Sequence, residues 1–109
     1  QALGKSQINE KILDENEVLK VFKEFIEQEG NIIFREELNQ LGSVEKKIII
    51  KMAKEAIVKI SEISRAIDED MNVTGRFLEH LINKGFVYKK ERGVYNIEDP
   101  VFIEWLKLI

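Results

Sequence analysis

Side chains that can contact nucleic acid are concentrated between residues 74 and 92. Four lie in one predicted helix and three in the hairpin that follows it: Thr74, Gly75, Arg76 and His80, then Lys89, Lys90 and Arg92. Arginine can donate two hydrogen bonds to a guanine edge, threonine or histidine can supply single ones, and lysine or arginine can neutralise phosphates. Glycine at position 75 would let a phosphate or a base edge come close. If helix and hairpin share a surface, these seven residues predict a contact with duplex DNA.

The positive charge is local to this segment. Residues 72–93 carry five Lys/Arg against two Asp/Glu, whereas residues 1–42 carry five against nine and residues 61–70 carry one against four. The chain as a whole has a formal net charge of −3, so it is not a basic nucleic-acid coat. The acidic segment 61–70 would lie near the phosphates in the usual docking. We therefore expect weak DNA binding that rests mostly on phosphate contacts.

Each of these residues also has a plainer interpretation. An arginine on the solvent face of a helix is often simply hydrated, and charges on a hairpin discourage pairing of its edge with another strand. His80 is the only histidine and cysteine is absent, which excludes a histidine relay and a metal site of several histidines or cysteines. Three consecutive helical acids, Asp68 to Asp70, point in three directions and suit a solvated helix end. No catalytic residue, cofactor or metal is predicted for this chain.

Length and composition are those of one small globular protein, with 109 residues, 44% of them hydrophobic and 34% charged. No run approaches the roughly 18 apolar residues of a membrane span, and no signal-peptide pattern opens the chain. We therefore expect a cytoplasmic protein without a membrane partner.

Gly4-Lys5-Ser6 matches the end of a phosphate-binding loop, but the earlier glycine and the strand that this loop requires are missing.

Caps and hydrophobic spacing predict helices in the first half of the chain. One helix begins at Asp14 and stops at Gly30, and a second runs from a cap at Asn31 to a stop at Gly42. Ser43 caps a third helix, and residues 57–60, three of which are β-branched, suit a small edge strand.

The second half has the order of a helix-turn-helix followed by a hairpin. Ser61 caps a helix over residues 61–70, residues 71–73 form a turn, and Asn72 caps a helix over residues 73–84 that Gly85 ends. Strands follow at 86–90 and 94–97, joined by a tip that contains Gly93. Asp99 caps a last helix with Pro100 at its first position.

This order predicts a mainly α fold with a small β wing. A winged helix-turn-helix domain would span residues 43–109, after a helical segment over residues 1–42. The helix 73–84 would contact DNA together with the wing 86–97. The inward faces of three helices are expected to form one core from Ile48, Met52, Ile63, Ile67, Phe77 and Leu81.

The last 67 residues also carry a family resemblance. The most specific element is the tail pattern Tyr95-x-Ile97-x-Asp99-Pro100-x-Phe102-x-x-Trp105. Three earlier segments also contribute: Glu45-Lys46-Lys47-Ile48-Ile49-Ile50, Ile60-Ser61-Glu62-Ile63-Ser64 and Phe77-Leu78-Glu79-His80-Leu81-Ile82-Asn83-Lys84-Gly85-Phe86-Val87. Together these segments, roughly residues 43–109, resemble the C-terminal part of archaeal AAA-type ATPases of the STAND and origin-recognition-like group.

The resemblance implies that residues 1–42 are the end of an ATPase lid and that a longer parent protein binds ATP and Mg. The phosphate-binding loop and the acidic Mg-ligand strand of that family are not in this chain, so it is not expected to be an enzyme by itself. Two functions stay open: a DNA-binding domain, or a winged helix that docks on its own ATPase core or on another protein. A homodimer is compatible with either. Docking would leave an apolar patch around Phe102 and Trp105 uncovered.

Overall fold

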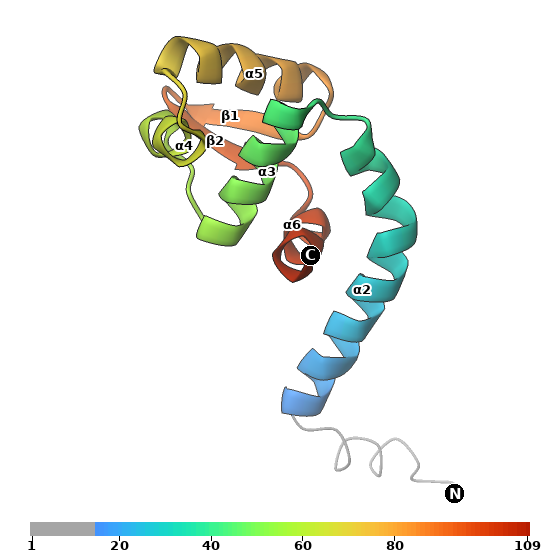
Figure 1. The fold of residues 1–109 in the computed structure, drawn as a ribbon. Coiled ribbons are helices and arrows are strands. Elements are labelled where there is room, and N and C mark those ends of the chain that lie inside the picture. Colours follow the sequence, from blue (N-terminus) through green and yellow to red (C-terminus); the bar gives the residue numbers. More distant parts are fainter. Residues whose placement is uncertain (1–14) are drawn as a thin grey trace, which may run out of the picture.

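The computed structural model describes residues 15–109, and these form five helices and one two-stranded antiparallel sheet (Figure 1). The prediction of a mainly helical protein with a small sheet is therefore confirmed. The helix start at Asp14 and the loop-like Gly4-Lys5-Ser6 lie outside the described residues. Within residues 15–109, no helix is both long and apolar enough to cross a bilayer.

Helix α2 spans Glu15–Asn39 without interruption, so the predicted stop at Gly30 and the predicted cap at Asn31 are wrong. Gly30 is buried inside the helix because Trp105 of the last helix lies against it. A Cβ atom on Gly30 would fall 2.2 Å from Trp105 Cδ1. The side-chain oxygen of Asn31 accepts a hydrogen bond from Trp105 Nε1 at 3.1 Å. In Figure 1, the N-terminal half of α2 projects beyond the rest of the fold.

Helix α3 spans Ser43–Glu55, and Gly42 is its N-cap. Gly42 therefore does not end the preceding helix, and Ser43 is the first helical residue of α3 rather than its cap. The Gly42 N–H donates to Glu45 Oε1 at 2.9 Å, which satisfies a backbone group next to the free end of the helix. The carboxylate of Glu45 thus supplies the capping contact that we had expected from a serine.

Helices α4 (Ile60–Ile67) and α5 (Met71–Asn83) lie where the two helices of a helix-turn-helix were predicted. Their boundaries differ from the predicted ones, because Lys59 and not Ser61 is the N-cap of α4, and Asp68 ends α4 with a φ of 58°. The Val73 N–H donates to Asp70 Oδ1 at 2.8 Å, so Asp70 rather than Asn72 caps α5. The turn therefore lies at residues 68–70, immediately before the predicted turn at 71–73.

A glycine ends α5 as predicted. Gly85 has a φ of 84°, a conformation that glycine adopts without the steric cost of a Cβ atom. The Phe86 N–H donates to the Leu81 carbonyl at 2.9 Å and the Gly85 N–H to the Ile82 carbonyl at 3.0 Å. This pair of bonds is a Schellman motif, and it turns the chain directly into the hairpin.

The hairpin consists of β1 (Val87–Glu91) and β2 (Val94–Ile97), with Val87 opposite Ile97 and Lys89 opposite Tyr95. The predicted strand at 57–60 is reduced to an isolated bridge between Lys59 and Val94, because α4 already begins at Ile60. Two backbone hydrogen bonds extend this bridge, from the Ile60 N–H to the Gly93 carbonyl and from the Tyr95 N–H to the Val58 carbonyl.

Helix α6 spans Pro100–Leu108 and begins as predicted, with Asp99 Oδ1 accepting a hydrogen bond from the Val101 N–H at 2.8 Å. Phe102 and Trp105 of α6 are buried against Phe34 of α2, with ring centroids 5.1 and 5.9 Å from that of Phe34. The apolar patch around Phe102 and Trp105 that the docking alternative predicted is therefore covered by α2.

The core is close to the predicted one. The predicted members that are buried belong to α3, α4 and α5: Ile48, Met52, Ile63, Ile67 and Leu81. Phe77 packs against this core but is only partly buried, whereas the neighbouring Leu78 is fully buried. The core thus holds α5 on α3 and α4, and it fixes which side of α5 faces solvent.

Candidate nucleic-acid interface

The start of α5 and the tip of the hairpin meet at one side chain. A Cβ atom on Gly75 would lie 3.6 Å from Ile60 Cδ1, and one on Gly93 would lie 3.8 Å from Ile60 Cγ2. The residues that follow and precede these glycines in the chain are Arg76 and Arg92. Packing around Ile60 therefore brings the first turns of α5 and the hairpin tip to the same region of the molecule.

Four of the predicted cationic contacts come from this region: Arg76, Lys89, Lys90 and Arg92. All four are exposed, and within residues 15–109 none of their side chains takes part in a hydrogen bond or an ion pair. Lys59, at the bridge to β2, is exposed in the same way. These positive charges are hydrated rather than neutralised by the protein, so they can be used by an anionic partner.

Thr74 is not available to a partner. Its side chain is fully buried, and its hydroxyl donates to the Asp70 carbonyl at 2.8 Å. The prediction that Thr74 reads a base edge is therefore wrong, because the side of α5 that carries Thr74 and Leu78 faces the core. Gly75 is half-buried, and a Cβ atom there would make only an ordinary contact with Ile60, so the packing of α5 on α4 does not require glycine at this position.

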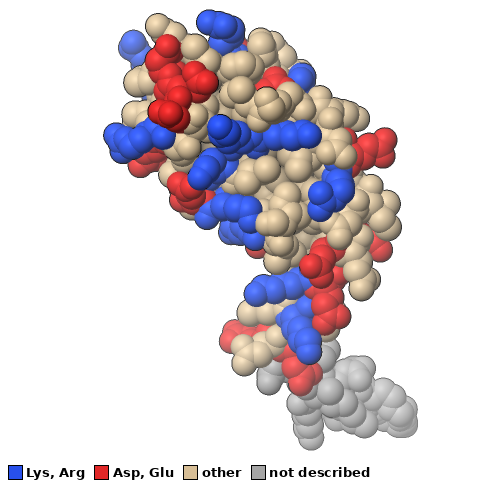
Figure 2. Space-filling view, in the orientation of Figure 1, with Lys and Arg blue, Asp and Glu red and all other residues tan. Residues whose placement is uncertain are grey.

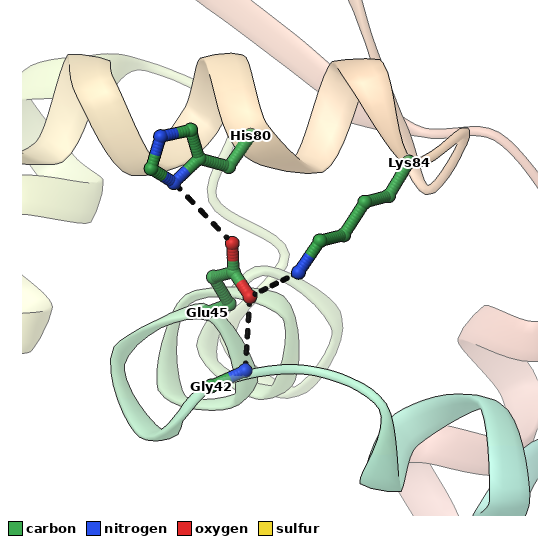
Figure 3. A network of polar contacts seen from close by, with 4 residues as sticks. All are labelled: Gly42, Glu45, His80 and Lys84. Carbon is green, nitrogen blue, oxygen red and sulfur yellow. Dashed lines mark hydrogen bonds and ion pairs between the residues drawn. The ribbon is translucent and has the colours of Figure 1, made fainter.

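His80 belongs to a network inside the fold. Its Nδ1 lies 3.5 Å from Glu45 Oε2, and Lys84, one turn further along α5, donates to Glu45 Oε1 at 2.9 Å (Figure 3). The Glu45 side chain is 6% exposed, whereas those of His80 and Lys84 are 49% and 44% exposed. His80 therefore spans the contact between α5 and α3, and Lys84 is not a free cation.

Burial alone would raise the pKa of Glu45. The Gly42 N–H, the hydrogen bond and charge of Lys84, and the charge of His80 together outweigh burial and hold that pKa below its ordinary value. Glu45 is therefore ionised at neutral pH and links the start of α3 to the last turns of α5. Sequence reasoning missed this residue, although a glutamate three positions after Gly42 is a capping signal.

Acidic side chains lie next to the predicted interface. Asp68, Glu69 and Asp70 form the turn that leads into α5, and all three are exposed. Asp70 caps the helix, while Asp68 and Glu69 remain free of side-chain partners among residues 15–109. Among those same residues, no group of three or more His, Cys, Asp or Glu side chains is arranged to hold a metal ion. The turn therefore puts negative charge at the start of the helix that carries Arg76.

The charges of one face of the molecule are mixed. Figure 2 shows blue and red side chains side by side over the compact part of the fold, with blue crossing its middle, where Figure 1 shows α3. Helix α3 carries four lysines, of which Lys51 pairs with Glu55 at 2.9 Å and Lys54 donates to the carbonyl of Ile109. Part of the positive charge of the protein is thus on α3, outside the predicted interface, and two of the four lysines there are paired with neighbouring groups.

Comparisons with known proteins place the chain in a family without assigning it an activity. No curated protein and no solved structure matches it. One family model matches residues 31–106, from the middle of α2 to α6, and its description is a domain of unknown function, DUF8462. Since this match covers more than half of the sequence, the chain belongs to the DUF8462 family.

Proposed function

We propose that residues 43–109 are a winged helix-turn-helix domain that binds duplex DNA. The observation that carries the proposal is the meeting of α5 and the hairpin tip at Ile60, with Arg76, Lys89, Lys90 and Arg92 exposed and without partners among residues 15–109. The order of elements also supports it. In a winged helix, α3, the bridge at Lys59, α4, α5 and the hairpin would follow one another in this sequence.

In this proposal, α5 enters the major groove and the hairpin lies over the flanking backbone. Arg76 is the residue best suited to reach a base edge, because it is exposed in the second turn of α5. Lys89, Lys90 and Arg92 contact phosphates, which position the domain but carry no sequence information. With Thr74 buried and His80 held by Glu45, few groups are left for reading bases. Sequence preference is therefore weak.

The alternative function is docking on a protein, including the ATPase core of a longer parent. That alternative predicted an uncovered apolar patch at Phe102 and Trp105, and both side chains are at most 2% exposed. The tail pattern that carries the resemblance to archaeal ATPases has a structural use in this fold, since Asp99 caps α6 and Trp105 packs on Gly30. A parent ATPase that binds ATP and Mg remains a prediction from the resemblance.

Fluorescence anisotropy of a labelled mixed-sequence duplex tests the proposal. At low salt we expect a Kd in the range of about 10⁻⁴–10⁻⁶ M, as for non-specific binding, and weaker binding at higher salt. Arg76→Ala should weaken binding roughly 3–10-fold. Lys20→Ala is the matched control, because Lys20 is an exposed cation on the projecting half of α2 and should have no effect. Absence of binding by the wild type at low salt would favour docking on a protein.

A further inference from the structure

The projecting half of α2 buries none of its side chains against the rest of residues 15–109. Every residue from 15 to 25 is exposed, and the first buried residue of the helix is Ile26. A helical segment of this length is marginal in water unless an amphipathic face is packed against something. Its sequence nevertheless contains aliphatic and aromatic residues at helical spacing, including Val18, Phe22 and Phe25. These residues therefore indicate a contact that residues 15–109 of a single copy do not make.

The apolar residues of α2 form an exposed stripe, which we call the α2 stripe. It consists of seven side chains that are 47% to 71% exposed: Val18, Leu19, Val21, Phe22, Phe25, Ile32 and Ile33. Four of them, at positions 18, 22, 25 and 32, follow the alternating steps of four and three of a coiled-coil seam, with Glu29 at the remaining position. Helix α6 packs on another side of α2, through Gly30 and Phe34.

We propose that the α2 stripe is a homodimer interface and that its occupant is the α2 stripe of a second copy of this chain. The seven side chains leave on the order of 600–700 Å² of apolar surface in water, close to the roughly 800 Å² per partner of a stable interface. The first five residues of the α2 stripe lie within about two helical turns, between positions 18 and 25. None of these side chains needs a charged or hydrogen-bonding partner. A two-fold axis brings the same stripe onto itself, so that each copy covers part of the apolar surface of the other.

Glu29 sets the orientation of the two helices. In a parallel pair, the two Glu29 carboxylates would face each other across the seam, which is destabilising. In an antiparallel pair, Phe22 of one copy packs against Phe25 of the other, and Glu29 lies near the outer end of the contact. The dimer is therefore antiparallel, with four phenylalanines around the axis. This inference concerns α2 alone and does not depend on DNA binding by α5.

Sedimentation equilibrium without DNA, over about 1–100 μM, tests the interface. We expect the wild-type mass to rise to that of two chains. Phe25→Glu should weaken the dimer by roughly 100-fold or more, because it places a charge in the seam. Tyr88→Glu is the matched control: Tyr88 is an aromatic residue on β1 that is 41% exposed, and its replacement should leave the dimer intact.

Circular dichroism of each variant separates dissociation from unfolding. If Phe25→Glu disturbs the fold, Leu19→Glu provides a second charged variant at a stripe position that is 56% exposed. A wild type that stays monomeric over the whole concentration range overturns the proposal. A dimer that persists equally in both stripe variants also overturns it, because the contact would then lie elsewhere.

Disulfide crosslinking tests the orientation, since the chain has no native cysteine. Phe22→Cys and Phe25→Cys proteins are oxidised separately and as a mixture. An antiparallel dimer predicts that the mixture crosslinks at least several-fold more than either protein alone. Efficient crosslinking of each protein with itself, without a gain on mixing, would contradict the antiparallel arrangement.

Discussion

At the scale of single residues, Glu45 has the most consequential environment. It is nearly buried on α3, yet its carboxylate accepts from the Gly42 N–H and from Lys84 and lies beside His80 (Figure 3). The two basic side chains belong to α5, so this one carboxylate links the helix that carries Arg76 to the start of α3. The negative charge of Glu45 strengthens its contacts with the Gly42 N–H, Lys84 and His80.

Replacing Glu45 with glutamine removes that charge and keeps an acceptor for the Gly42 N–H. We expect Glu45→Gln to lower the free energy of unfolding by about 1–2 kcal/mol at neutral pH, since hydrogen bonds to charged groups exceed neutral ones and Lys84 and His80 are half exposed. Urea denaturation measures the change. Glu104→Gln is the control, because the Glu104–Lys107 pair is exposed on both sides and should contribute less than about 0.5 kcal/mol. Equal losses in the two variants would contradict a special role for Glu45.

The effect should depend on pH in a defined direction. The folded-state pKa of Glu45 is below the ordinary value of 4.5, so the unfolded chain takes up the proton first as the pH falls. The stabilisation by Glu45 is therefore complete above about pH 5 and is lost as the pH falls through the folded-state pKa. The difference between wild type and Glu45→Gln should shrink accordingly in acid.

At the scale of elements, the packing of α2 on α6 depends on a missing side chain. Gly30 lets Trp105 lie directly on the helix backbone, and Trp105 in turn donates to Asn31 and stacks beneath Arg35, whose Cζ is 5.3 Å from the ring centroid. Gly75 of α5 is also inside a helix, but a Cβ atom there would make only an ordinary contact with Ile60. The two glycines therefore differ in the space around them.

Alanine at the two positions should change stability in opposite directions. Gly30→Ala should destabilise by about 1–3 kcal/mol, because the added methyl group displaces the Trp105 ring and outweighs the better helix propensity. Gly75→Ala should stabilise by about 0.5–1 kcal/mol, because nothing offsets that propensity. Thermal and urea unfolding, with tryptophan fluorescence as a probe of the only Trp, measure both. A stabilising Gly30→Ala would show that α2 does not pack on α6 in this way.

Features of this fold that depend on neighbouring residues could be predicted from the sequence better than contacts between distant residues. The hairpin, the glycine at 85 and the Asp99-Pro100 start of α6 depend on neighbouring residues, and the structure has them as predicted. Gly30 was misread as a helix stop, because its reason for being glycine is a tryptophan 75 positions later in the chain. The burial of Thr74 was missed although helical periodicity indicates it, because Leu78 and Leu81 follow Thr74 by four and seven positions and share its side of α5.

At the scale of the whole molecule, the arrangement of charge limits the proposed function. The exposed acids of the turn at residues 68–70 directly precede α5, the helix that carries the exposed Arg76. The net charge of −3 gives no general attraction to DNA. Affinity in this proposal is therefore a balance between a few phosphate contacts and repulsion from the turn.

Removing the acids of the turn should strengthen DNA binding. Asp68→Asn with Glu69→Gln takes away two negative charges while Asp70 keeps capping α5, and asparagine tolerates the left-handed φ of 58° at position 68. We expect affinity for duplex DNA to rise roughly 3–10-fold at low salt and the gain to fade at high salt. Glu24→Gln with Glu27→Gln, on the projecting half of α2, is the charge-matched control and should have no such effect. A turn variant that binds no better than this control would place the DNA away from α5.

The salt dependence of DNA binding tests the central proposal most directly. The logarithm of the association constant is measured against the logarithm of salt concentration for the wild type, for Lys90→Ala with Arg92→Ala, and for Lys20→Ala with Lys23→Ala. Phosphate contacts by Lys89, Lys90 and Arg92 predict a slope of about −2.7 for the wild type and for the α2 control, and about −0.9 for the hairpin variant. Equal slopes in all three proteins, or no binding by the wild type at low salt, would contradict the proposal.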